Sequence, residues 1–132
     1  MKLMHKDIAI DKIVSRLKRN KQIIACYIFG SYLKNKKKAN DVDICVITDG
    51  MKIMKMAEIA SDFDAPYDIS FMEKMPSYNA FEVLHTGKPL FINNKEKFTR
   101  KWLVIVRNHL EHEPMRQRIF AGVKRWMSLK TA

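Results

Sequence analysis

The fold is decided by two short stretches, each at one end of an apolar run: Phe29-Gly30-Ser31 and Asp41-Val42-Asp43-Ile44. A glycine and a serine follow the first run, and two carboxylates open the second run at its first and third positions. Because side chains alternate along a strand, these two carboxylates share one face. The sequence therefore predicts a phosphate-binding turn that faces a pair of metal-binding carboxylates.

A third apolar run carries one more carboxylate. In residues 67–72, Asp68 and Ser70 point to one face while Tyr67, Ile69 and Phe71 point to the other. If the second and third strands lie in one sheet, their apolar faces can share a layer of helices. This arrangement places Asp68 with Asp41 and Asp43 on the open face of the sheet.

The remaining chain supplies helices and one further strand. Apolar spacing of i, i+3, i+4 and i+7 predicts helices, and alternating or continuous apolar runs predict strands. The expected helices span residues 7–20, 51–62 and 78–85, and the expected strands span 22–29, 41–48, 67–72 and 89–93. Residues 31–40 form a polar, basic connector that can include one helical turn.

Two more helices are expected after the last strand, over residues 95–110 and from Pro114 to about residue 127, as a helical hairpin. The fold class is α/β (α+β): a small mixed sheet with helices on one face and the carboxylate site on the other. We expect a core over residues 1–94 and a helical extension of the same domain over 95–132. The hairpin either folds back on its own core or makes a dimer.

Length and composition favour a single domain outside the membrane. The chain has 132 residues, and none of its apolar runs approaches the roughly 20 residues that a membrane helix needs. We therefore expect a cytoplasmic protein. Its two cysteines, Cys26 and Cys45, fall inside apolar runs and have no metal-ligand spacing, so we expect buried free thiols.

The net charge of +11 is unevenly distributed. Residues 1–40 carry 11 Lys and Arg against 2 acids, residues 95–132 carry 10 against 3, and residues 41–94 carry 4 against 9. The basic ends can attract polyanions. A solvated, lysine-rich surface explains them equally well.

Three converging carboxylates repel one another unless cations neutralise them. All-oxygen ligands favour hard ions such as Mg²⁺ or Mn²⁺ over zinc. Two such ions are a common device for phosphoryl or nucleotidyl transfer. The Gly30-Ser31 turn can add backbone N–H groups and a hydroxyl for phosphate oxygens.

An Asp-x-Asp pair alone is weak support, because Asp62-Phe63-Asp64 is a second one. That pair falls at the end of a predicted helix with no Gly-Ser turn before it, and we interpret it as solvated. The informative feature is the whole order: strand, Gly-Ser, connector, Asp-x-Asp strand, helix, and a strand with one more Asp.

This order resembles the signature of the DNA polymerase beta-like nucleotidyltransferase superfamily. Its parts here are Gly30-Ser31, Asp41-Val42-Asp43-Ile44 and Tyr67-Asp68-Ile69-Ser70. In length and in residues 84–91, the chain is most similar to the minimal nucleotidyltransferases of prokaryotes, over about residues 8–93.

The resemblance implies roles for individual residues. Asp41 and Asp43 would hold two Mg²⁺ or Mn²⁺ ions, and Asp68 would complete the catalytic metal site and help to deprotonate the acceptor. Gly30 and Ser31 would bind the phosphates of a nucleoside triphosphate. Lys34 stands where the family usually has Arg, and it supplies charge without the bidentate fork of that residue.

The resemblance also implies partners, because many minimal nucleotidyltransferases pair with a small helical HEPN protein, and some adenylylate it as antitoxins. We therefore expect an enzyme that moves a nucleoside monophosphate, AMP from ATP in the first instance, onto a hydroxyl acceptor. The alternative is a binding module with a weak or idle site that acts by complex formation with a protein partner or RNA. The acceptor, the preferred base and a possible homodimer stay open.

Overall fold

The computed structural model describes the backbone of residues 2–131 and the side chains of residues 9–129. Its helices and strands follow the predicted order closely up to residue 94. They are α1 (Lys2–Lys18), β1 (Ile23–Phe29), α2 (Ser31–Lys34), β2 (Val42–Thr48), α3 (Ile53–Ser61), β3 (Tyr67–Phe71), the 3₁₀ turn η1 (Met72–Lys74), α4 (Ser77–Thr86), β4 (Lys88–Ile92) and α5 (Lys95–Thr131).

The four strands form one mixed sheet in the order β3-β2-β1-β4. Strand β1 pairs antiparallel with both β2 and β4, whereas β2 and β3 run parallel and are joined through α3. The predicted class, α/β (α+β) with a small mixed sheet, is confirmed. The central strands β1 and β2 are buried along most of their length, as expected for strands covered on both faces.

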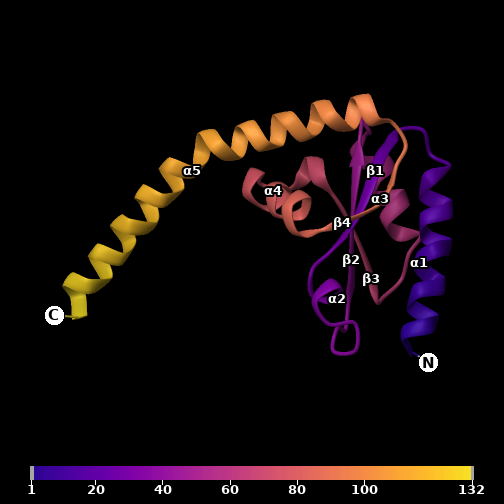
Figure 1. Cartoon of the computed structure of the whole chain (residues 1–132), viewed down its shortest axis with the longest axis horizontal. Helices are drawn as coiled ribbons and strands as arrows, with labels where there is room; N and C mark the ends of the chain where they lie inside the picture. Colours follow the sequence, from indigo (N-terminus) through magenta and orange to yellow (C-terminus); the bar gives the residue numbers. More distant parts are fainter. Residues whose placement is uncertain (1, 132) are drawn as a thin grey trace.

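Helices cover both faces of the sheet (Figure 1). On one face α1 and α3 contribute Ile13, Leu17 and Met56 to a core with alternate residues of β1 and β2. On the other face Val83 of α4 and Phe98 of α5 pack with a second set of strand residues that includes Cys45. The expectation that helices cover only one face of the sheet is therefore wrong, and the carboxylate face is open only at its end near Asp43. It failed because α4 and α5 cover the apolar part of this face and leave only its polar end.

The C-terminal region is one helix, α5, of 37 residues, with Pro114 inside it. The predicted hairpin is therefore wrong. A proline within a helix removes one backbone hydrogen bond and can bend the helix without ending it. Helix α5 indeed bends, and its second half runs away from the rest of the molecule (Figure 1).

Cys26 and Cys45 are free and fully buried, and burial raises the pKa of Cys45 to about 12. Across residues 2–131, no helix combines the length and apolar character needed to cross a membrane.

Candidate active site

The turn at Gly30 has a backbone conformation that other residues rarely adopt. Its φ is 83° and its ψ is −159°, in a region of backbone space that is essentially restricted to glycine. A Cβ atom at this position would also collide with Oδ2 of Asp43. Both the backbone conformation at Gly30 and its close approach to Asp43 therefore require a residue without a side chain.

The sheet brings two of the predicted carboxylates side by side. Asp43 on β2 and Asp68 on β3 are direct partners in the parallel register, and neighbouring strands lie about 4.8 Å apart. Asp41 comes immediately before β2 and is exposed, as is Asp68. The expected neighbourhood of Asp41, Asp43 and Asp68 is therefore present at one end of the sheet.

The carboxylates influence one another electrostatically. The pKa of Asp43 is raised above its usual range, first because the side chain is partly desolvated and then because Asp68 and Asp41 carry like charges. Neutralisation by a divalent cation is one way to relieve this repulsion, and an all-carboxylate donor set suits Mg²⁺ or Mn²⁺.

The side chains do not form a ready-made metal cage. Within residues 9–129, no three Asp, Glu, His or Cys side chains are already arranged around a common point that could hold an ion. The backbone places the three carboxylates next to one another, and their side chains would have to rotate to bind a common ion. The donor chemistry thus fits a hard cation, and metal binding by these residues stays a prediction.

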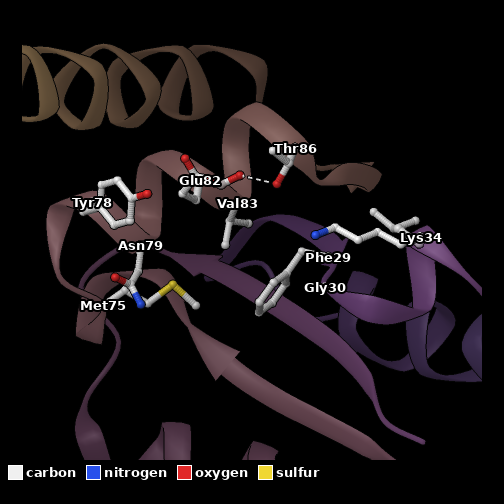
Figure 2. Close-up of a pocket in the computed structure, with 10 residues that line it drawn as sticks. Phe29, Gly30, Lys34, Met75, Tyr78, Asn79, Glu82, Val83 and Thr86 are labelled. Atoms are coloured by element: carbon white, nitrogen blue, oxygen red, sulfur yellow. Dashed lines mark hydrogen bonds between the residues drawn. The ribbon is translucent and has the colours of Figure 1, made fainter. Parts of the chain in front are cut away.

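A cavity of about 270 Å³ opens directly beside Gly30 (Figure 2). Its walls come from the end of β1, from α2 and from α4. The residues that line it are Phe29, Gly30, Leu33, Lys34, Met75, Tyr78, Asn79, Glu82, Val83 and Thr86. The predicted nucleotide contact Lys34 therefore lies in the same hollow as the predicted phosphate turn.

Contacts with α5 hold the α4 wall of this cavity in place. The Arg116 guanidinium lies 4.3 Å from the centre of the Tyr78 ring and makes two hydrogen bonds to Glu113, of 2.9 and 3.1 Å. One turn further along α4, Phe81 stacks on His109 with ring centres 3.8 Å apart. Helix α5 thus holds the Tyr78 side chain in place through Arg116.

The contribution of α4 to the cavity cannot be recognised in the sequence. Tyr78, Asn79 and Glu82 look like the solvent side of a short helix, and nothing in their spacing sets them apart. They line the cavity because α4 crosses the end of β1, which is a tertiary arrangement. By contrast, the second Asp-x-Asp pair is peripheral, as predicted: Asp62 ends α3 and forms an exposed ion pair of 3.7 Å with Arg16.

Residues 11–96 match the family described as Polymerase beta, Nucleotidyltransferase. The chain belongs to this family. The matched segment begins within α1 and reaches the start of α5, so it includes the Gly30 turn and all three carboxylates. The predicted family and its enzyme class are therefore confirmed.

A curated relative of this nucleotidyltransferase comes from Methanocaldococcus jannaschii and is named as a protein adenylyltransferase. It is 30% identical over an alignment of 88 positions that covers 61% of this chain and 70% of the relative.

Solved structures of toxin–antitoxin complexes contain similarly folded chains. One, a toxin–antitoxin with AMP-PNP, matches with a TM-score of 0.67 and 21% identity over 87% of this chain and 95% of that chain. Another, the tri-AMPylated Shewanella oneidensis HEPN toxin in complex with MNT antitoxin, matches with a TM-score of 0.65 and 20% identity over 92% and 98%. At these identities the likeness establishes the shared fold.

Proposed function

We propose that this nucleotidyltransferase moves AMP from ATP onto a hydroxyl group of a HEPN-type partner protein. One observation carries the proposal: Asp43 and Asp68 are paired in register beside a glycine turn, in a chain of this family. The adenylyltransferase name of the curated relative and the AMPylated HEPN toxin among the structural neighbours support AMP and this acceptor.

Each residue has a role in the proposed transfer. The acceptor hydroxyl oxygen attacks the α-phosphorus of ATP, and pyrophosphate leaves. Gly30 and Ser31 bind phosphate oxygens through the turn, because glycine allows the backbone N–H groups to come close. Asp68 accepts the proton of the attacking hydroxyl or orients it, and Lys34 offsets part of the triphosphate charge.

Asp41, Asp43 and Asp68 are the residues that would hold Mg²⁺ or Mn²⁺. When bound, a pair of such ions lowers the pKa of the attacking hydroxyl and neutralises charge on the leaving group. The raised pKa of Asp43 supports this assignment, because partial desolvation and then the like charges of Asp68 and Asp41 disfavour its ionised form, which a bound cation would favour. An enzyme that consumes ATP and keeps two unpaired cysteines is suited to the cytoplasm.

Label transfer tests the proposal. The protein is incubated with α-labelled ATP, Mg²⁺ and a candidate HEPN-type acceptor, and labelled protein is measured over time. We expect labelling by the wild type and a loss of at least about a hundredfold for Asp43→Asn, as when a group that stabilises transition-state charge is removed. Equal labelling by the two proteins would contradict the proposal.

A second candidate function is neutralisation of a partner by binding alone. It is favoured by the outer half of α5, where Ile119, Phe120 and Trp126 are all more than half exposed. Exposed apolar surfaces of this kind commonly mark protein interfaces. If Asp43→Asn protects cells from a co-expressed HEPN toxin as well as the wild type does, the protein acts by binding alone. If the variant loses protection, the protein acts by AMP transfer.

A further inference from the structure

The cavity beside Gly30 has two chemically different ends. Gly30, which lies against Asp43, and Lys34 mark one end, where the triphosphate is expected. Tyr78, Asn79 and Glu82 lie on α4 at the other end (Figure 2). The two ends are therefore suited to different parts of one ligand.

The α4 end is unsuited to phosphate. Glu82 is a carboxylate that would repel a phosphate group placed beside it, and the nearby Arg116 guanidinium is already hydrogen-bonded to Glu113. The rest of the cavity lining includes the apolar side chains of Phe29, Met75 and Val83. A volume of about 270 Å³ is small beside the roughly 300–1,000 Å³ typical of drug-sized sites, so a whole nucleoside triphosphate would not fit inside. A flat, uncharged ring suits this end.

The α4 end also offers hydrogen-bonding groups and a fixed aromatic wall. The Tyr78 side chain is 40% exposed, and Arg116 packs against its ring at 4.3 Å. Asn79 can donate and accept hydrogen bonds, whereas an ionised Glu82 can only accept them. A ligand beside Glu82 must therefore present a donor.

We propose that this end of the cavity holds the base of the nucleotide and that Glu82 selects a base with an exocyclic amino group. This inference rests on the proposed function, because it assumes that the triphosphate lies at Gly30. Adenine and cytosine carry an amino donor at the ring position where hypoxanthine and uracil carry a carbonyl group. Hypoxanthine and uracil present a carbonyl oxygen, which the carboxylate repels. Glu82 and Asn79 are thus specificity-determining residues.

Nucleotide binding tests the inference without any transfer step. Dissociation constants for ATP, ITP and tripolyphosphate are measured by calorimetry in the presence of Mg²⁺ and without an acceptor. ATP and ITP differ in the base only by an amino group against a carbonyl. We expect the wild type to bind ATP roughly tenfold more tightly than ITP, or better, as for a site that hydrogen-bonds the group concerned.

The decisive variant is Glu82→Gln, because an amide can donate to the carbonyl of ITP. We expect its preference for ATP over ITP to fall to about twofold or less. The matched control is Glu58→Gln on α3, whose side chain is 68% exposed and far from the cavity lining. It should keep the preference of the wild type.

Three other outcomes would overturn the inference. Equal affinity of the wild type for ATP and ITP would remove base selection and leave the proposed transfer standing. Tighter binding of all three ligands by Glu82→Gln, tripolyphosphate included, would place phosphate in the cavity instead of the base. Absence of binding of any nucleotide would overturn the proposed function itself, and the inference with it.

Discussion

Gly30 and Asp43 constrain each other at the scale of single residues. The glycine adopts a conformation that side chains disfavour, and the space that a side chain would need is taken by the carboxylate. The sequence predicted that both residues belong to one site. It could not predict their contact, because the contact depends on how β1 and β2 pair.

The first prediction compares two glycines with positive φ. Gly30 has a φ of 83° and contacts Asp43, whereas Gly50 has a φ of 66° and open space around it. We expect Gly30→Ala and Gly50→Ala each to lower the free energy of unfolding by about 1–3 kcal/mol because of backbone strain. Only Gly30→Ala should also abolish label transfer, since it displaces the carboxylate.

Chemical denaturation and the transfer assay measure the two effects separately. If Gly50→Ala lost transfer to the same degree, loss of stability would explain both results, and the assigned role of the Gly30 turn would be wrong.

The second prediction concerns the charge of Asp43. Its pKa is raised in the folded protein, so ionised Asp43 disfavours folding at pH values above that pKa, and the penalty disappears as pH falls through it. Asp43→Asn should therefore melt at a higher temperature than the wild type at pH 7 without divalent cations. The difference should shrink at low pH and on addition of millimolar Mg²⁺.

Thermal melts across pH, with and without Mg²⁺, provide the measurement. An Asp43→Asn protein that melts below the wild type at pH 7 would show that the carboxylate stabilises the fold, contrary to this account.

At the scale of helices and strands, the sequence predicted the core well and the C-terminal region poorly. Strands β1, β2 and β3 were recognisable because their apolar patterns are strong and their ends are marked by Gly30, Asp41 and Pro66. The sequence predicts that Pro114 lies in the first turn of a new helix, yet the flanking residues continue one helix through it. A proline within a helix and a proline at its start have the same local signature, so sequence alone could not separate them.

The third prediction divides α5 into two functional halves. Its inner half packs on the core, where Phe98 stacks on Tyr27 with ring centres 6.0 Å apart. Its outer half is exposed from Pro114 to Leu129. Deleting residues 115–132 should therefore leave the melting temperature within a few degrees of the wild type. By comparison, Phe98→Ala should lower the free energy of unfolding by about 2 kcal/mol, less than for a fully buried phenylalanine.

Thermal and chemical unfolding of the two variants provide the test. A large loss of stability on deletion would mean that the outer half, through the contact of Arg116 with Tyr78, is part of the folding core.

At the scale of the whole molecule, the candidate active site is acidic, whereas both ends of the sequence are basic. The three carboxylates lie in the acidic middle of the chain, and residues 114–132 contain five Lys or Arg and no acid. The class of fold and the family were predictable because the spacing of the turn and the carboxylates is specific. The cavity beside Gly30 was not predictable, because residues from β1, α2 and α4 meet there only after folding.

Replacement of one Asp-x-Asp pair at a time tests the central claim most directly. The measurement is the initial rate of AMP transfer from α-labelled ATP to the acceptor protein. Asp41→Asn/Asp43→Asn is compared with Asp62→Asn/Asp64→Asn, which makes the same chemical change at the end of α3. We expect the first double variant to lose transfer by at least about a hundredfold and the second to stay within about twofold of the wild type. Equal rates for the two double variants would contradict the assignment of the active site.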